Sequence, residues 1–370
     1  MSSRHRILLG LNLPWSRYAA DFGVRKTRNA DWPSDGVPPW RTTINEVLQR
    51  LRETGFRVVR WWLLGDGGHY GQIPRLDDRG IWQMDYNVGA RPRPAHGNWL
   101  VDSPSALPDQ FMEDFMFMVH AISNAGLKVL PVLIDHRFCF DGDETDRTLV
   151  KGGRHELIND ETKRRQFLSM VLTPLVQAVY SAGLGNAIYA WDLINEPEWC
   201  TDVLYPHALR CLWEERTQTG WFGVRQANVT QQNMRAYIRD GASIINGAGF
   251  LSTVGFVRRE SPRASGEHSW NDASLGVTLQ QFHFREFYDD LERHDSFWPS
   301  PSSCFIGEIS DGLSAVNSGI SLGLYDRLSI IEGQGYSAAF IWPEHKPRVD
   351  PFLHLGPRDI ADIQRYVSGR

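Results

Sequence analysis

The stretch AIYAWDLINEPEW, Ala187–Trp199, decides the fold class. Its first half consists mainly of apolar and β-branched residues, which are followed by Asn195 and Glu196 and then by a proline that ends the apolar run. This pattern is typical of a buried strand whose last two side chains are an amide and a carboxyl group. The stretch SCFIGEI, Ser303–Ile309, repeats the design and brings Glu308 to the end of a second apolar strand. The sequence therefore predicts two glutamates, each at the end of a buried strand.

Six further apolar runs have the length and composition of strands: Arg6–Leu13, Phe56–Leu64, Leu127–Ile134, Phe250–Val257, Val277–Phe282 and Ser337–Trp342. Amphipathic runs predict helices at Thr43–Thr54, Pro108–Asn124, Glu161–Ser181, Gln231–Asn246, Glu286–His294, Leu324–Gly333 and Pro357–Val367. The segment after the fifth strand is too rich in Gly, Pro and Ser to favour a helix. Short strands that alternate with helices predict an α/β protein, a closed parallel (β/α)8 TIM barrel with long βα loops. Because no linker interrupts the pattern, we expect residues 1–370 to form a single catalytic domain.

Composition narrows the classes of function. The chain has 370 residues, with 39 basic and 44 acidic side chains, so its formal charge is 39 − 44 = −5. No basic patch is concentrated in the sequence, which argues against a nucleic-acid partner. No apolar run reaches the roughly 18 residues of a membrane span, and the N-terminus has no leader-like pattern. We therefore expect a cytoplasmic protein, or a secreted one if a signal peptide has been removed.

Polar side chains stand at the ends of the predicted strands, where a barrel of this kind keeps its catalytic groups. They are Arg60, Asp135, His136, Asn195, Glu196, His283, Glu308 and Trp342. Cleavage of a glycosidic bond requires two carboxyl groups that face each other, and the two glutamates meet this requirement if the barrel closes. The chain also contains 14 tryptophans, whose flat apolar faces suit stacking on sugar rings. Candidates besides Trp342 are Trp61, Trp62, Trp99, Trp199, Trp213 and Trp221.

The triplet Asn195-Glu196-Pro197, with Glu308 three strands later, resembles the signature of the clan A glycoside hydrolases. Family 5, the cellulase and mannanase family, is the nearest match, and at the level of strand order the resemblance covers nearly the whole chain. The residues that fall where this family keeps its sugar-site residues are Arg60, His136, His283 and Trp342. The resemblance implies a retaining double displacement on a β-linked glucan- or mannan-type substrate.

In that mechanism Glu196 would be the general acid and then the general base, and Glu308 would be the nucleophile. Retention needs carboxyl groups roughly 5–5.5 Å apart, and their repulsion favours a proton on one of them. Arg60 would keep Glu308 ionised, Asn195 would bind the sugar 2-hydroxyl, and Trp342 would form a stacking floor.

Two departures from the family pattern stand out. The family usually has a tyrosine two residues after the strand-six histidine, where this chain has Arg285. The strand-seven glutamate is often followed by Phe-Gly, and here by Ile309-Ser310. The first departure leaves open what orients the nucleophile, and the chain could belong to a neighbouring clan A family.

Several alternatives remain. The enzyme could be an exo-acting β-glycosidase on a galacto- or furanoside-configured glycan, or the chain could be a catalytically silent carbohydrate-binding barrel. A metal-dependent barrel hydrolase would use Asp135, His136 and His283, but the first strand ends in Asn12-Leu13 rather than in two spaced histidines. We therefore expect neither a metal nor a cofactor. The sequence leaves open the oligomeric state, and Cys200 and Cys211 would pair only in an oxidising compartment.

Overall fold

The computed structural model describes residues 6–13, 22, 40–67, 70, 74–76, 82–84, 103–144, 150–202, 228–256, 273–284, 303–310, 322–343 and 355–369. The expected helix at Glu286–His294 lies outside these residues, as do Arg285 and Cys211.

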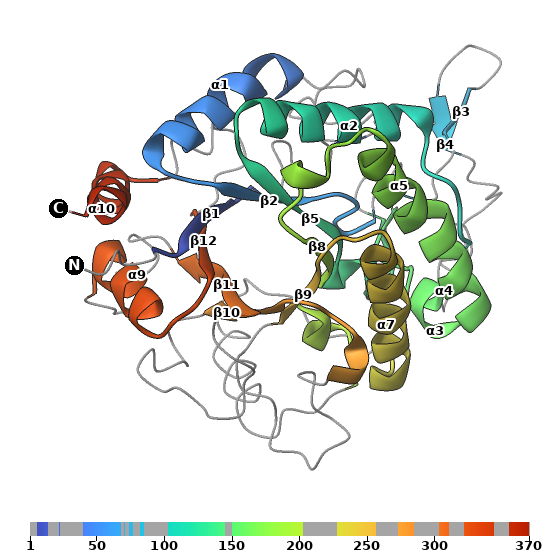
Figure 1. Cartoon of the computed structure of the whole chain (residues 1–370). Helices are drawn as coiled ribbons and strands as arrows, with labels where there is room; N and C mark the ends of the chain where they lie inside the picture. Colours follow the sequence, from blue (N-terminus) through green and yellow to red (C-terminus); the bar gives the residue numbers. More distant parts are fainter. Residues whose placement is uncertain are drawn as a thin grey trace.

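A closed parallel barrel of eight strands forms the centre of the molecule (Figure 1). Its strands are β1 (Leu8–Asn12), β2 (Val58–Trp62), β5 (Lys128–Asp135), β8 (Trp191–Asn195), β9 (Ser252–Phe256), β10 (Gln280–Phe284), β11 (Cys304–Ser310) and β12 (Ala338–Trp342). They pair in chain order and β12 closes the ring on β1. The predicted (β/α)8 barrel and all eight predicted strands are confirmed, with the strand ends shifted by a few residues. Two small antiparallel hairpins lie in the loops, β3 (Pro74–Leu76) with β4 (Trp82–Met84) and β6 (Asp143–Glu144) with β7 (Val150–Lys151).

Helices surround the barrel (Figure 1). They are α1 (Trp40–Thr54), α2 (Asp109–Asn124), α3 (Glu156–Asn159), α4 (Glu161–Phe167), α5 (Thr173–Ser181), α7 (Gln231–Gly247), α9 (Leu324–Gly333) and α10 (Pro357–Ser368). Short α3 was not among the predicted helices. Between β9 and β10 the described residues contain one 3-10 turn, η5 (Ala273–Leu275); most of the segment for which no helix was expected lies outside the described residues.

The predicted helix Glu161–Ser181 is not one regular α-helix. A π-helical turn, η2 (Leu168–Leu172), separates α4 from α5, and the N–H of Thr173 donates to the carbonyl of Leu168, five residues earlier. The next residue is Pro174, which has no N–H to give to the α-helical ladder. A single wider turn accommodates the proline without ending the helix.

Along each barrel strand every second side chain points inward, so the inward-facing residues form layers that succeed one another from the floor to the site. A separate apolar cluster fills the floor: Val58, Leu130, Ala190, Phe305, Ala338 and Phe340. Two residues further along β2 and β12 stand Arg60 and Trp342, on the same inward face. Within the barrel, a layer of polar side chains thus lies directly above the apolar cluster that fills the floor.

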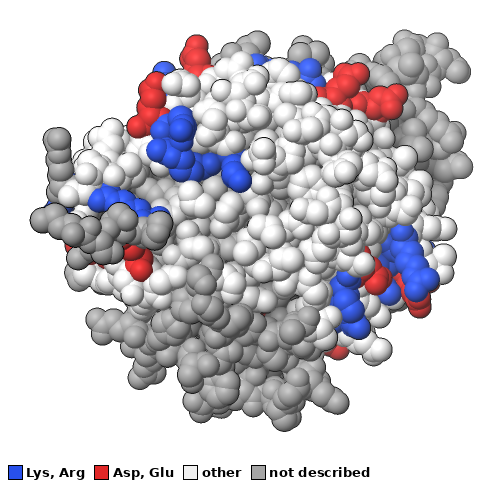
Figure 2. All heavy atoms as spheres, in the orientation of Figure 1, with Lys and Arg blue, Asp and Glu red and all other residues white. Residues whose placement is uncertain are grey.

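Charged side chains on the visible described surface form small separate groups of both signs (Figure 2). Within the part of the chain that the structure describes, no helix is long and apolar enough to cross a membrane.

Candidate active site

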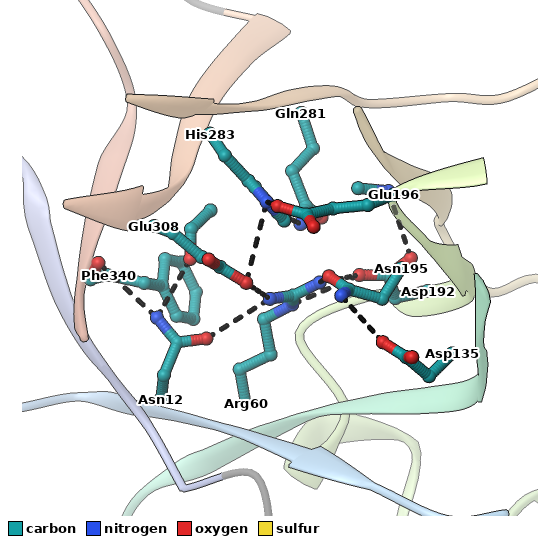
Figure 3. A network of polar contacts seen from close by, with 12 residues as sticks. Asn12, Arg60, Asp135, Asp192, Asn195, Glu196, Gln281, His283, Glu308 and Phe340 are labelled. Atoms are coloured by element: carbon teal, nitrogen blue, oxygen red, sulfur yellow. Dashed lines mark hydrogen bonds and ion pairs between the residues drawn. The ribbon is translucent and has the colours of Figure 1, made fainter. Parts of the chain in front are cut away.

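Arg60 lies at the centre of the polar layer and is fully buried (Figure 3). Its Nη1 donates to Glu308 Oε1 at 2.9 Å and to Asn12 Oδ1 at 3.1 Å. Its Nη2 donates to Asp192 Oδ2 at 2.8 Å and to Asn195 Oδ1 at 2.7 Å. Its Nε also donates to Asp192 Oδ2, at 3.1 Å. One guanidinium therefore joins four strands and pairs with two carboxylates.

Glu196 follows β8 in an unusual backbone conformation. Its φ of 51° makes it the one described non-glycine residue with a positive φ. The left-handed region is unfavourable for a residue with a Cβ, and Pro197 restricts the preceding residue further. Its N–H donates to the carbonyl of Gly255 at 2.6 Å. Strain of this kind persists where the surrounding structure over-determines a residue, and here it aims a carboxyl group into the barrel mouth.

Both oxygens of the Glu196 carboxyl group have partners. Oε2 accepts from Trp199 Nε1 at 2.9 Å, and Oε1 lies 2.9 Å from His283 Nδ1. Trp199 belongs to the short 3-10 turn η4 (Pro197–Trp199), so the turn that ends the strand also supplies a donor to its glutamate.

The two glutamates meet at His283 (Figure 3). His283 pairs with Glu308 across β10 and β11, after a register shift that follows Phe282. Its Nδ1 lies 3.4 Å from Glu308 Oε1. One carboxylate oxygen from each glutamate and a ring nitrogen of His283 all lie within 4.8 Å of one another. This spacing fits the roughly 5–5.5 Å between carboxyl groups in retaining glycosidases better than the roughly 6.5–9.5 Å in inverting ones.

Asp192 is a buried counter-ion beneath this pair. Burial raises its pKa, and the Arg60 guanidinium is the largest of the influences that oppose the rise, followed by His283 and Gln281. Its Oδ1 accepts from the N–H of Gly255 at 3.1 Å. Asp192 lies too deep to meet a substrate, since no part of it is exposed.

Glu196, His283 and Glu308 are also the described residues whose spacing would admit a metal ion. The donor set argues against such a site, because the Arg60 guanidinium, 2.9 Å from Glu308 Oε1, already stands where a cation would be attracted. No step in the chemistry below needs a metal.

Asp135 and His136 form the next layer outward. Asn195 Nδ2 donates to Asp135 Oδ2 at 2.9 Å, and the other oxygen, Oδ1, accepts from the N–H of Arg137 at 3.0 Å. His136 Nδ1 lies 3.4 Å from Asp135 Oδ1, and its ring is 6.3 Å from that of Trp199. His136 thus lies beside the turn that holds Glu196.

Trp342 is half-buried at the end of β12. Its ring meets Trp62 edge-on at 5.8 Å, and the Arg60 guanidinium lies 4.4 Å from the centre of a Trp62 ring. The aromatic pair forms one wall beside the arginine that holds Glu308.

The structure brings the seven residues predicted for the site to one end of the barrel: Arg60, His136, Asn195, Glu196, His283, Glu308 and Trp342. Sequence reasoning did not assign a role to Asn12, Asp192 or Gln281. The signal that could have identified them in the sequence is a charged or amide side chain within an apolar strand, at a position that faces into the barrel.

Other expectations have mixed outcomes. Trp61 is fully buried and packs 6.1 Å from Phe22, so it belongs to the core rather than to the site. Trp99, Trp213 and Trp221 lie outside the described residues. Cys200 is a free buried thiol next to Cys139, with its Sγ 3.3 Å from the carbonyl of Pro197. Among the described residues, Arg60 and His283 both contact the Glu308 carboxylate and so help to orient it; Arg285 lies outside these residues.

No protein-family model matches the chain, and no curated protein sequence matches it. Solved structures do match. A β-1,4-D-mannanase from Cryptopygus antarcticus is 17% identical, with a TM-score of 0.62 over 98% of this chain and 89% of that one. A β-1,4-mannanase from the sea hare Aplysia kurodai is 19% identical, with a TM-score of 0.61 over 99% and 93%. A β-mannanase from the blue mussel Mytilus edulis is 18% identical, with a TM-score of 0.62 over 99% and 92%.

The chain has the fold of these mannanases. The likeness extends over almost the whole of each chain, so it includes the barrel and the helices that surround it. At this level of identity it concerns the fold, and the chemistry has to be argued from the site.

Proposed function

We propose that this protein is a retaining β-glycoside hydrolase similar to clan A, family 5. The observation that carries the proposal is the meeting of Glu196 and Glu308 at His283, with ligand atoms within 4.8 Å of one another. Both carboxyl groups are nearly buried, so their charges interact in a medium less polar than water. The fold shared with β-mannanases supports the same reading.

In the first step, the Glu308 carboxylate attacks the anomeric carbon and displaces the leaving-group oxygen, which takes the proton of Glu196. The product is a glycosyl ester of Glu308 and a free alcohol. Before attack, Arg60 donates a charge-assisted hydrogen bond of 2.9 Å to Glu308 Oε1. This contact orients the carboxylate toward the anomeric carbon.

In the second step, Glu196 is ionised and removes a proton from water while the water oxygen attacks the anomeric carbon. The ester bond to Glu308 breaks, and the sugar leaves with its original configuration. The donor from Trp199 stabilises the ionised Glu196 that this step needs.

Neighbouring side chains suit the sugar in the reacting subsite. The amide nitrogen of Asn195 has a second hydrogen besides the one that Asp135 accepts, and we assign it to the sugar 2-hydroxyl. Trp342 offers a face for stacking beneath the ring. A β-1,4-linked manno- or gluco-configured glycan is the substrate we propose, and the mannanases with this fold favour mannan. Exo-attack on a galacto- or furanoside-configured glycan is the alternative.

The test is turnover of a panel of aryl β-glycosides and β-linked polysaccharides by wild type, Glu308→Ala and Glu196→Ala. We expect turnover of one sugar configuration, its loss in Glu308→Ala, and rescue of Glu196→Ala by azide on an activated aryl glycoside, with a β-glycosyl azide as product. Azide replaces water as nucleophile and needs no general base, so its product reports the retained configuration.

A wild type that binds glycans in calorimetry without turning over any sugar of the panel would indicate the silent binding barrel. An α-configured azide, or equal rates in wild type and both variants, would refute the assignment of Glu196 and Glu308.

A further inference from the structure

Gln281 lies at the heart of the polar layer although it touches neither glutamate. It is fully buried on β10, two residues before His283, so both side chains point into the barrel. Its amide nitrogen Nε2 lies 3.3 Å from His283 Nε2 (Figure 3). The Gln281 side chain also forms a hydrogen bond with the Asp192 carboxylate, and an ionised carboxylate accepts only from the amide N–H.

Two glycines make room for this amide. A Cβ on Gly307 would lie 2.8 Å from both Cγ and Cδ of Gln281, and closer still to Nε2. A Cβ on Gly255, the residue that pairs with Gln281 across β9, would lie 2.9 Å from Gln281 Nε2 and 3.0 Å from His283 Nε2. The amide is therefore wedged between two strands and has little freedom to turn.

Asp192 decides which way the amide faces. Its Oδ2 accepts two hydrogen bonds from Arg60, so it is held beside a permanent positive charge. If the amide of Gln281 turned over, its carbonyl oxygen would face this carboxylate. As it stands, Oε1 meets no hydrogen-bond donor among the described residues, which is unfavourable for a buried carbonyl. The opposite orientation would be worse, because it would replace a hydrogen bond to an ionised carboxylate, which is stronger than one between neutral groups, by repulsion.

From this arrangement we propose that Gln281 is a positioning residue that fixes the tautomer of His283, an inference that rests on the proposed glycosidase activity. An amide N–H can only donate, so His283 Nε2 accepts from it and the ring proton is on Nδ1. Nδ1–H then donates to Glu196 Oε1 at 2.9 Å and also faces Glu308 Oε1 at 3.4 Å.

The consequence for catalysis concerns the proton of Glu196. With the ring proton on Nδ1, Glu196 Oε1 accepts from His283 at 2.9 Å and Oε2 accepts from Trp199 Nε1 at 2.9 Å. Because both partners only donate, neither holds the acid proton, which passes to the leaving-group oxygen in the first step; in the second step the ionised carboxylate takes a proton from water. The opposite tautomer would turn a lone pair of Nδ1 toward both glutamates, hold the acid proton on Oε1, and repel the ionised Glu308.

The test combines a spectrum with kinetics. Protein labelled with ¹⁵N-histidine is studied by long-range ¹H–¹⁵N correlation at neutral pH, and the His283 signals are identified by their loss in His283→Gln. We expect a protonated Nδ1 and an unprotonated Nε2. Gln281→Met keeps the length of the side chain but removes the donor, so the Nε2–H tautomer becomes populated. The expected fall in kcat is about 10- to 100-fold with little change in KM, which is less than the roughly 10²–10⁴-fold that general acid–base catalysis contributes.

Gln280→Met is the matched control, because this neighbour faces away from the barrel interior and takes no part in the site. It should leave both the spectrum and kcat unchanged. A wild-type proton on His283 Nε2, or a Gln281→Met variant with the wild-type tautomer and kcat, would overturn the proposal.

The wild-type spectrum alone decides the tautomer, so the proposal can be refuted even if Gln281→Met fails to fold. If wild type has no glycosidase activity, the proposed function fails while the spectrum still reports on Gln281 separately.

Discussion

Replacement of Arg60 by methionine tests whether the site depends on a buried charge pair. Arg60 and Asp192 have no exposed side-chain surface, and the side chain of Glu308 is 9% exposed. Methionine keeps an apolar stem of similar length but leaves Asp192 without its counter-ion. Loss of one partner of a buried ion pair costs about 3–5 kcal/mol, out of a total stability of about 5–15 kcal/mol. We expect the variant to fold but with much lower resistance to urea.

The cost should depend on pH in a defined direction. Burial already raises the pKa of Asp192 and Arg60 opposes the rise, so the folded-state pKa rises further without Arg60. A carboxyl group whose pKa is higher in the folded state than the roughly 3.9 of the unfolded chain loses stability as pH rises through that interval. The difference in unfolding free energy between wild type and Arg60→Met should therefore be smaller at pH 5 than at pH 7.

Urea unfolding followed by tryptophan fluorescence measures both effects. Adding Asp192→Asn to Arg60→Met removes the unpaired charge and should recover about 2 kcal/mol at pH 7. Arg57→Met is the control, because this arginine donates to backbone carbonyls of Arg52 and Phe56. Equal costs at both pH values, together with no recovery in the double variant, would show that Asp192 is not the group that Arg60 stabilises.

Three further predictions concern the same site. Glu196→Gly should be about 1–2 kcal/mol more stable than Glu196→Ala in urea unfolding, because glycine relieves the positive φ of 51°; equal midpoints would contradict the strain. Gly307→Ala should cost about 1–3 kcal/mol in the same assay, because its Cβ meets Gln281, whereas Gly247→Ala, with no atom within 4 Å, should not destabilise the fold. Trp199→Phe removes the hydrogen bond that Trp199 donates to Glu196, and this loss favours the protonated form of the carboxyl group. The limb of the pH–rate profile that reports Glu196 should therefore move to higher pH; an unmoved limb would show that Trp199 does not influence the acid.

The barrel could be predicted from sequence because its strands are short, continuous apolar runs that are buried on both faces, and such runs are local. Because a run of this kind is apolar almost throughout, a polar residue at its end, such as Glu308, stands out as a site candidate. The effect of a proline on the backbone is also local. The π-helical turn before Pro174 was nevertheless not predicted, because the helical periodicity of the sequence continues past it.

Asp192 and Gln281 were not predicted because their importance depends on neighbours from other strands. The role of a charged residue inside a strand depends on which side chains face it from the neighbouring strands, and that is known only once the strand register is known. In the closed barrel, Asp192 lies beneath Arg60 of β2 and next to Gln281 of β10, and glycines of β9 and β11 leave space for the amide.

The sequence by itself determined that two glutamates, an arginine and a histidine would reach the same end of one barrel. Tertiary structure alone decided which atoms of these side chains meet. The register shift after Phe282 sets His283 opposite Glu308, and the left-handed turn at Glu196 brings the other carboxyl group to the same imidazole. Strand order follows from local patterns in the sequence. A hydrogen bond, in contrast, depends on donor–acceptor distances to within tenths of an ångström, and those distances are set by how all eight strands close together.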